Sequence, residues 1–412
     1  MAYTTRTTCR VCDSADLIPL FSLGEQYVSN FISRDDPPGE KCPVRLELCR
    51  NCTLVQLKDT APQELLYSRH YWYKSGVTQT MRDALRDVTK AAELAVDLKP
   101  GDIVLDIGSN DGTLLRSYTK QCVRIGVEPA DNLAIPENYE GMELIHDFWN
   151  YESYTKCVNE IECEDLWLIN AKIITAIGMF YDLEDPNQFI ADISKALARD
   201  GVFIAQLMTL RNMLALDDVG NLAHEHLEFY SLKSLRYLLG RHGLEMFDIE
   251  TNSVNGQSDR LYICHKNARP TSRRVIAKLG IEVHLDLVLH YDAVFKRWEN
   301  KKWQCVNFIK KVVAEGKKVW VYGASTKGNT ILQYYGLDHM LIEGACDINP
   351  EKIGKFTVGS MIPIYSQKYA RTKADYFLVL PYAFLDEFMA NEAEWRAGGG
   401  KFLVPLPEFR VV

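Results

Sequence analysis

The stretch that decides the fold is Val104-Leu105-Asp106-Ile107-Gly108-Ser109-Asn110-Asp111-Gly112-Thr113-Leu114-Leu115. A run of apolar residues ends in an acid, a turn of small residues follows, and a helical pattern comes next. A second apolar run, Val123 to Val127, ends in Glu128, twenty residues after Gly108. This order is typical of a nucleotide-binding βαβ unit, in which the second acid accepts hydrogen bonds from ribose hydroxyls. The sequence therefore predicts an α/β fold with a nucleotide-like cofactor at this turn.

The spacing of the glycines indicates which cofactor the turn binds. A dinucleotide site usually has the pattern G-x-G-x-x-G, but here it is Gly108-x-Asn110-x-Gly112 with Asp106 just before it. An acid at that place would raise the energy of bound phosphates, whereas it suits the ammonium and sulfonium groups of S-adenosylmethionine. We therefore predict S-adenosylmethionine; a nicotinamide cofactor, or a turn without any ligand, is the alternative. The residues predicted to bind it are Asp106, Gly108, Asn110, Asp111, Gly112, Glu128 and Pro129.

Length and composition are those of an ordinary globular protein. The 412 residues suggest two or three domains, with 47% hydrophobic and 25% charged residues. A net charge of −8 without a long Lys/Arg run argues against a nucleic-acid partner. No apolar run reaches the length of a membrane span, and the first residues lack the apolar core of a signal peptide. With 11 scattered cysteines, we expect a cytoplasmic protein, monomeric or a small homo-oligomer.

Changes of pattern divide the chain into three predicted parts. Residues 1–65 carry cysteines and prolines and show little periodicity. Residues 66–270 begin with an amphipathic helix and then alternate strand and helix patterns, as α/β domains do. After a linker with Pro270, residues 271–412 hold a helical stretch and a second α/β unit. The two glycine turns, one in each α/β unit, predict two Rossmann-like domains.

The N-terminal cysteines have the spacing of a zinc site. Cys9-x-x-Cys12 and Cys49-x-x-Cys52 form two pairs, and each pair can place two thiolates on one side of a tight turn. Two such turns complete a tetrahedral shell, which leaves no open position on the metal. We therefore predict structural zinc bound by these four residues, with free thiols or redox pairs as the alternative.

The densest cluster of titratable residues is His224-Glu225-His226. Its spacing differs from the H-E-x-x-H pattern of zinc peptidases. Histidine is the natural general base near neutral pH, and a neighbouring carboxylate can hold its tautomer. A solvent-exposed loop or a hydrogen-bonded, partly buried histidine is the alternative. A second cluster, Tyr71 to Gly76, has aromatic rings that could form the wall of a sugar site or simply pack.

Taken together, these motifs resemble the deoxysugar C-methyltransferases, which add methyl branches to nucleotide-linked keto sugars. The resemblance covers almost the whole chain and rests on separated motifs in the right order. They are the two Cys-x-x-Cys pairs, Tyr73-Lys74-Ser75-Gly76, Asp106 to Gly112, His224-Glu225-His226-Leu227, Asn255-Gly256, Tyr322-Gly323-Ala324 with Lys327 to Thr330, and Val404 to Pro407.

The resemblance implies a zinc module, a central class I methyltransferase domain and a C-terminal Rossmann-like domain, with the sugar nucleotide between the last two. It also implies that a base removes the proton alpha to the sugar ketone and that the enolate carbon attacks the sulfonium methyl. On this basis His226 is the base, and Glu225 orients it. Tyr73 is a second acid/base or stabilises the enolate, and His224 supports the loop or touches the sugar.

Residues of both α/β units are expected to bind the sugar nucleotide. They are Tyr71, Ser75, Tyr181, Asn255, Arg260, Tyr322, Lys327, Asn329 and Asp347. The turn from Gly323 to Thr330 could hold a pyrophosphate through backbone N–H groups at a helix N-terminus, with Lys327 adding charge and Asp347 binding a ribose. A Rossmann-like unit kept for packing alone is the alternative.

Three positions depart from the family pattern. Tyr181 stands where a histidine is expected, Gln257 replaces a glycine before Ser258-Asp259-Arg260, and Tyr382-Ala383 replaces a Trp-Asn pair. The sugar and the methylated carbon therefore stay open, and a cell-surface polysaccharide precursor or reduced catalytic activity are further alternatives. O- or N-methylation of another small molecule, and a zinc-bearing protein that binds without turnover, also stay open.

Overall fold

Three large β-sheets organise the chain, and the computed structural model describes residues 3–62, 65–66, 71–161, 169–254 and 256–412. The first sheet is antiparallel and consists of β12 (Glu228–Phe229), β5 (Val55–Leu57), β4 (Lys41–Cys49) and β2 (Leu17–Tyr27), in that order. Its edge strand β12 comes from the middle of the chain, where Glu228 pairs with Gln56 and Phe229 with Val55. The N-terminal part therefore completes its sheet with a distant segment. Short pairs join β1 (Thr4–Thr5) to β6 (Asp59–Thr60) and β3 (Phe31–Ile32) to β17 (Phe356–Thr357).

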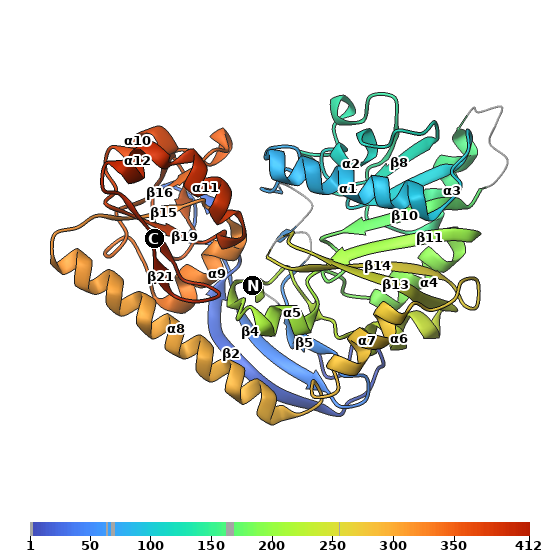
Figure 1. Ribbon diagram of the computed structural model, residues 1–412, viewed down its shortest axis with the longest axis horizontal. Coiled ribbons are helices and arrows are strands. Elements are labelled where there is room, and N and C mark those ends of the chain that lie inside the picture. The colour runs from blue at the N-terminus through green and yellow to red at the C-terminus, as the bar shows by residue number, and fades with distance from the viewer. Residues whose placement is uncertain (1–2, 63–64, 67–70, 162–168, 255) are drawn as a thin grey trace.

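The central sheet has the order β13-β14-β11-β10-β7-β8-β9. Strands from β11 to β9 run parallel, and β14 and β13 are antiparallel to their neighbours. Helices cover both faces, with α1 and α2 on one side and α4, α6 and α7 on the other (Figure 1). The strands are β7 (Ile103–Ile107), β8 (Val123–Val127), β9 (Glu143–Ile145), β10 (Ala171–Ile177), β11 (Leu197–Leu207), β13 (Leu244–Asn252) and β14 (Ser258–His265). The helices are α1 (Gln79–Ala95), α2 (Thr113–Arg116), α3 (Tyr151–Glu160), α4 (Pro186–Ala196), α5 (Leu210–Ala215), α6 (Leu232–Arg241) and α7 (Arg273–Ile281).

Local chemistry explains where these elements lie. The central parallel strands are buried on both faces, which is why they read as continuous apolar runs. Helix α1 begins where the Thr78 hydroxyl accepts a hydrogen bond from the Met81 N–H, and it buries one apolar stripe that includes Leu85 and Val88. The predicted α/β architecture is confirmed, and α1 is the amphipathic helix predicted at the start of residues 66–270.

The C-terminal sheet has the order β18-β16-β15-β19-β20-β21 and is parallel except for its last strand. It confirms the predicted second Rossmann-like unit. The strands are β15 (Val319–Tyr322), β16 (Gly344–Asp347), β18 (Ile364–Ser366), β19 (Tyr376–Val379), β20 (Lys401–Val404) and β21 (Arg410–Val411). The helices are α8 (Val288–Ala314), α9 (Thr326–Tyr335), α10 (Gln367–Arg371), α11 (Leu385–Asn391) and α12 (Ala393–Ala397), and the short 3-10 helices of the chain are η2 (Pro136–Tyr139), η3 (Val219–Asn221), η4 (Pro350–Lys352) and η5 (Tyr382–Phe384). Within the described ranges, no helix has the length and apolar character needed to cross a membrane.

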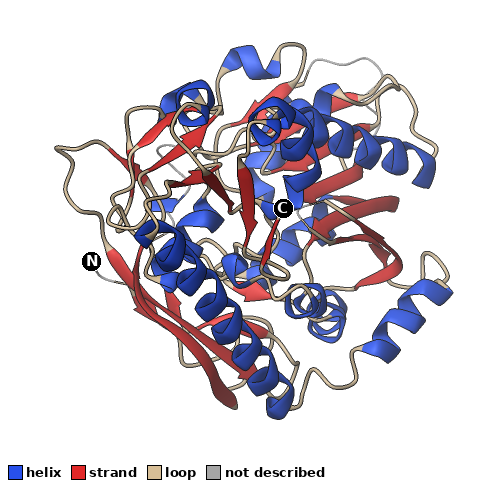
Figure 2. Cartoon of the chain, turned by 60° about the vertical axis from the view of Figure 1, so that its left-hand side comes forward, coloured by secondary structure: helices blue, strands red, loops and turns tan. Residues whose placement is uncertain are grey.

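The long helix α8 connects the C-terminal part to the first sheet. It lies along β2 (Figure 1), where the Phe295 ring stacks on Phe21 with centroids 4.4 Å apart. Figure 2, which distinguishes helices from strands, shows the same long helix beside the curved N-terminal strands. Further along, Ile309 and Val312 join a core that includes Val319 of β15. Because this core is shared between parts, the borders at residues 65 and 270 remain predictions.

Candidate active site

The candidate site is a cavity at the points where the strand order of two sheets reverses. The central sheet reverses between β7 and β10, and the C-terminal sheet reverses between β15 and β19. Ligands of open α/β sheets bind outside the carboxyl ends of the strands at such points. Here both points open onto one cavity of about 540 Å³, lined by Gly108 and Gly178 from the central sheet and by Ser325 and Pro381 from the other. The two places at which such sheets bind ligands therefore face the same cavity.

The turn after β7 has the backbone of a nucleoside site. Gly108 and Asn110 have positive φ values of 69° and 56°, and a Cβ on Gly108 would lie 3.0 Å from the Met179 side chain. The Glu128 carboxylate accepts hydrogen bonds from the backbone N–H of Asn110 at 2.8 Å and of Ala130 at 2.9 Å. Burial raises the pKa of Glu128 to about 7. A carboxyl group held in this way at the cavity wall fits the ribose of S-adenosylmethionine.

Most of the other residues predicted to bind the cofactor surround the turn and do not line the cavity. Pro129 lines the cavity, but Asp106, Asp111 and Gly112 do not. The Asp106 carboxylate is buried under the turn, where the Thr175 hydroxyl donates to it at 2.6 Å, and burial raises its pKa to about 7. Asp111 accepts from the N–H of Gly76 at 2.8 Å. Asp106 therefore lies behind the cavity wall and not, as expected, next to the cationic groups of the cofactor.

The segment from Tyr71 to Gly76 folds over this turn. The Ser75 N–H donates to the Asn110 side chain at 2.9 Å, and the Asn110 amide donates to the Tyr73 carbonyl at 3.1 Å. Tyr71, Tyr73 and Ser75 all line the cavity, and Tyr73 is 42% exposed. The structure thus brings this predicted aromatic cluster to the cofactor turn.

His226 lies on the cavity with one ring nitrogen fixed. Its Nδ1 is 2.7 Å from the carbonyl oxygen of Asn221, and a carbonyl only accepts, so Nδ1 carries the proton and Nε2 does not. The edge of the ring packs against Tyr181, with centroids 4.5 Å apart. Burial, and then the charge of Lys327, lowers the pKa of His226 to about 3. The imidazole is therefore neutral near pH 7, with Nε2 able to accept a proton.

The hydrogen-bond partner of Nδ1 of His226 is not the one expected from the sequence. At Nδ1, the backbone carbonyl of Asn221 takes the orienting role expected of Glu225. Glu225 lines the cavity beside His226, and burial raises its pKa to about 7. His224 lies outside the cavity lining, with Nε2 2.8 Å from the Cys42 carbonyl oxygen. His224 therefore ties the loop to β4 and does not reach the cavity.

On the C-terminal side, Lys327 is the predicted ligand-binding residue that reaches the cavity. It follows Ser325, whose hydroxyl begins helix α9 by accepting from the Gly328 N–H at 3.0 Å. The Lys327 Nζ lies 4.0 Å from the buried carboxylate of Asp218. A positive side chain and a helix N-terminus together favour an anion at this wall.

Three predicted residues of the C-terminal part hold the structure and lie outside the cavity lining. The Tyr322 hydroxyl donates to Glu392 at 2.7 Å, and the Asn329 amide donates to the Asn30 carbonyl at 3.1 Å. Asp347 pairs with Lys352 at 3.3 Å. Glu392 and Asn30 lie far from Tyr322 and Asn329 in the sequence, so the motif gave no sign of these two structural contacts.

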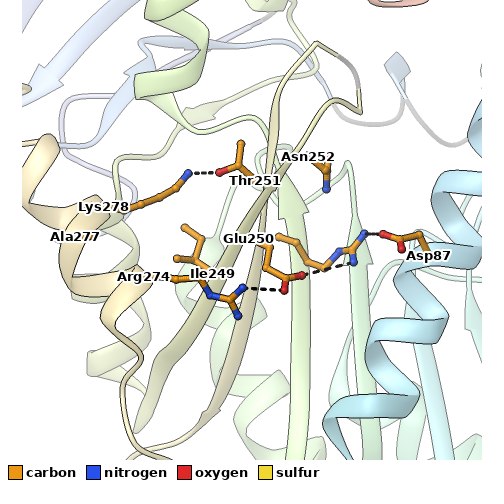
Figure 3. A pocket seen from close by; sticks show the side chains of 9 residues that line it. Asp87, Ile249, Glu250, Thr251, Asn252, Arg274, Ala277 and Lys278 are labelled. Carbon is orange, nitrogen blue, oxygen red and sulfur yellow. Dashed lines mark hydrogen bonds and ion pairs between the residues drawn. The ribbon is translucent and has the colours of Figure 1, made fainter.

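Arg260 lies outside this cavity as well. Its guanidinium donates to Gln206 at 3.0 Å and to Asp87 at 2.8 Å. It belongs to a second, open pocket of about 570 Å³, whose walls carry Glu250 and Lys278 (Figure 3). In that pocket acidic side chains pair with the basic ones. The predicted Asn255 lies outside the described residues.

Four acids that the sequence analysis did not single out also line the cavity. Asp182 follows Tyr181, and its Oδ1 is buried without a hydrogen-bond partner among the described residues. Burial, with the nearby charge of Glu225, raises its pKa well above the usual range. Asp218 lies in the loop before His226, and Glu184 and Asp185 directly precede α4. The run after Gly178 was noted for its tyrosine only, and a lone aspartate in a loop gives no signal of its own.

The four N-terminal cysteines come together as predicted. The Sγ atoms of Cys9, Cys12, Cys49 and Cys52 all lie within 4.8 Å of one another, with contacts of 3.5 Å for Cys9–Cys52 and 3.4 Å for Cys12–Cys49. Tetrahedral zinc with Zn–S bonds of about 2.3 Å needs sulfur atoms roughly 3.8 Å apart, so the cluster fits the ion.

Comparisons with known proteins agree with this arrangement. Family models match residues 9–67 as "Putative zinc binding domain", residues 77–249 as "Methyltransferase domain" and residues 253–407 as "C-methyltransferase C-terminal domain". The chain is 31% identical to C-methyltransferase NovU of Streptomyces niveus, over 98% of this chain and 96% of that protein. The chain belongs to this C-methyltransferase family.

Solved structures resemble parts of this C-methyltransferase at low identity. Magnesium protoporphyrin IX methyltransferase of Synechocystis PCC 6803, solved with S-adenosylhomocysteine, has 12% identity and a TM-score of 0.34, over 47% of this chain and 90% of that one. An S-adenosylmethionine-dependent methyltransferase of Clostridium acetobutylicum has 12% identity and a TM-score of 0.32, over 45% and 92%.

The family assignment settles the coarse function. The C-methyltransferase uses S-adenosylmethionine, and its cysteine cluster is a zinc site, so both predicted cofactors are confirmed. Binding without turnover and transfer to oxygen or nitrogen are both disfavoured by membership of a C-methyltransferase family. The substrate and the roles of individual residues are the subject of the proposals below.

Proposed function

We propose that this enzyme methylates a carbon of a keto sugar carried on a nucleotide, with His226 as the general base. One observation carries the proposal: His226 holds its proton on Nδ1 toward Asn221 and lines a cavity shared by the cofactor turn and the start of α9. In the neutral imidazole, Nε2 carries no proton and can accept one from carbon.

The chemistry requires a carbon that can lose a proton. Nε2 of His226 takes the proton alpha to a ketone, and the electron pair of the broken C–H bond delocalises onto the ketone oxygen. When bound, S-adenosylmethionine supplies the methyl group for this carbon. Gly108, Asn110 and Glu128 would hold the cofactor, with the ribose at the Glu128 carboxylate.

The developing oxyanion needs a hydrogen-bond donor. Tyr73 lines the cavity, and burial, with the nearby charge of Asp111, raises the pKa of its phenol above the usual range, so it keeps its proton at neutral pH. Its hydroxyl is our proposed donor to the enolate oxygen. Tyr71 and Tyr181 add aromatic walls, and the acids Asp182 and Asp218 suit sugar hydroxyl groups as acceptors.

The nucleotide is proposed to bind on the C-terminal side. Lys327 and the N-terminus of α9 favour the diphosphate, because both present positive charge to the cavity. Lys327→Gln should raise KM for the sugar nucleotide more than it lowers kcat. Lys310→Gln, at an exposed position of α8, is the matched control.

The decisive test is transfer to a panel of nucleotide-linked keto sugars with labelled S-adenosylmethionine, read by mass spectrometry. We expect a C-methylated product from at least one member, and none from the matching alcohols. Deuterium should exchange at the alpha carbon in the presence of S-adenosylhomocysteine. Transfer to an alcohol without exchange would instead point to O-methylation, and the proposal would fall.

A further inference from the structure

We infer that Asp217, Arg297 and Lys301 form a clamp through which helix α8 positions His226. The inference rests on the proposed role of His226 as the base. The three are positioning residues, since they act on the base through the loop that carries it.

The loop that carries His226 is unusual in its burial. From Asp217 to Tyr230 every side chain is buried, although its only regular elements are η3 and the two-residue β12. A buried loop must have its backbone polar groups satisfied and its conformation held by neighbours. β5 does this by pairing with β12, α9 contacts η3, and Arg297 of α8 binds Asp217 at the start of the loop.

The clamp holds the first residue of this loop. Arg297 lies against both carboxylate oxygens of Asp217, with Nε 3.2 Å from Oδ1 and 3.1 Å from Oδ2 and its terminal nitrogen 2.9 Å from Oδ1. Lys301, one turn along α8, donates to the same carboxylate and to the Pro407 carbonyl. The side chain of Asp217 is only 5% exposed. A carboxylate this buried depends on its cations, unlike a surface ion pair.

Arg297 also reaches the helix that precedes the loop. Its terminal nitrogen donates to the Leu214 carbonyl at 3.2 Å, near the end of α5. Asp217 itself has a positive φ of 51°, a conformation that a non-glycine residue adopts only when its surroundings impose it. The clamp therefore fixes the turn at which the chain leaves α5.

A short path leads from this turn to the base. The Val219 N–H donates to the Asp217 carbonyl at 2.9 Å, and the Asn221 N–H donates to the Asp218 carbonyl at 3.1 Å. The first bond closes the turn into η3 and the second belongs to η3, and the carbonyl at the end of η3 is the one that accepts from Nδ1 of His226. Displacement of Asp217 would move η3, and with it the acceptor that sets the tautomer of the base.

Helix α9 packs closely against η3 and so restricts movement of η3 relative to α9. A Cβ on Gly220 would lie 2.9 Å from Ile331 of α9, so the two elements are in close contact. Because α8 and α9 both belong to the C-terminal part, that part holds the base of the central part from two directions. Catalysis at the central sheet thus depends on the C-terminal part even before a substrate binds.

The test uses the full chain and Arg297→Gln, Arg297→Lys and Lys311→Gln. Lys311 is a matched control on the same helix, 73% exposed and 4.0 Å from Glu315. In protein labelled with ¹⁵N-histidine and saturated with S-adenosylhomocysteine, wild type and Lys311→Gln should show the Nδ1–H tautomer of His226. Arg297→Gln should lose this uniform state. With a keto sugar that the panel shows to be turned over, its kcat should fall about 10- to 100-fold. The kcat of Arg297→Lys should fall less. The affinity for S-adenosylmethionine should stay unchanged in both Arg297 variants.

Two outcomes would overturn the clamp. One is a wild-type histidine spectrum and wild-type kcat in both Arg297 variants. The other is a loss of S-adenosylmethionine affinity in step with kcat in both, which would show a general structural role. If His226→Ala itself turns over normally, the proposed base is wrong, and that result is distinct from a failure of the clamp alone.

Discussion

Nδ1 of His226 lies 2.7 Å from the carbonyl oxygen of Asn221, five residues earlier in the same buried loop. A backbone carbonyl cannot give up a proton, so it fixes the tautomer at every pH at which the ring is neutral. A carboxylate in that place would also stabilise the protonated ring. The carbonyl therefore orients the proposed base, and its hydrogen bond offsets only part of the effect of burial and Lys327, which lower the pKa of the ring.

His226→Gln should strongly reduce the rate of methyl transfer and leave the binding of S-adenosylmethionine unchanged. General-base catalysis contributes about 100- to 10,000-fold, and kcat should fall by this factor. Glu128 and Gly108 are untouched, so the Kd for S-adenosylmethionine measured by calorimetry should stay within about twofold of the wild-type value. His339→Gln, at an exposed position, is the control for both measurements. Normal turnover by the His226 variant would show that another group is the base.

We expect His226 to stay neutral at acidic pH values at which an ordinary histidine is protonated. Burial, and then Lys327, lowers the pKa of His226 to about 3, whereas an unfolded histidine titrates near 6.5. Between these values the unfolded chain binds a proton that the folded chain does not, so this group lowers the free energy of unfolding as the pH falls from 6.5 toward 3. NMR titration should find His226 neutral at pH 5, and His226→Gln should lose less stability across this window. A midpoint near 6.5 for His226 would contradict the expectation.

Glu128→Gln should weaken cofactor and product alike. The variant removes the charge that accepts from two backbone N–H groups and, as proposed, from the ribose. A charged hydrogen bond contributes roughly 1.5–3 kcal/mol, so both S-adenosylmethionine and S-adenosylhomocysteine should lose about 10- to 100-fold in affinity. Glu140→Gln, at an exposed position, should change neither. A selective loss for S-adenosylmethionine would mean that Glu128 senses the methyl-bearing sulfur and not the ribose.

The zinc content should follow the cysteine cluster. Metal analysis should give one zinc per chain, and Cys49→Ser should lose it and lower the Tm, while Cys122→Ser should keep both. Methyl transfer should also fall in Cys49→Ser, because β5, which follows the second cysteine pair, holds β12 and so the segment after His226. A zinc-free variant with full activity would show that the metal is not needed to hold this loop.

The sequence predicted those features that local patterns encode. The glycine turn after β7, the apolar strands and the Cys-x-x-Cys pairs each depend on a few neighbouring residues, and the structure has all of them. The Asn221 carbonyl gave no signal, because every residue has a carbonyl. The sequence did not indicate the clamp either, because Asp217 and Arg297 are 80 positions apart. Tyr322 and Asn329 show the converse, since a family motif contains residues that hold a turn as well as residues that line a site.

The pairing of β5 with β12 has a consequence for how the chain is made. Val55 pairs with Phe229, so the first sheet lacks its last strand until about 170 more residues have been synthesised. At about 5–20 residues per second this takes roughly 10 to 35 s. During that time β5 presents an open edge, a template for wrong pairing with other chains. This edge is therefore the part of the N-terminal sheet that we expect to favour aggregation until β12 has been made and has paired with it.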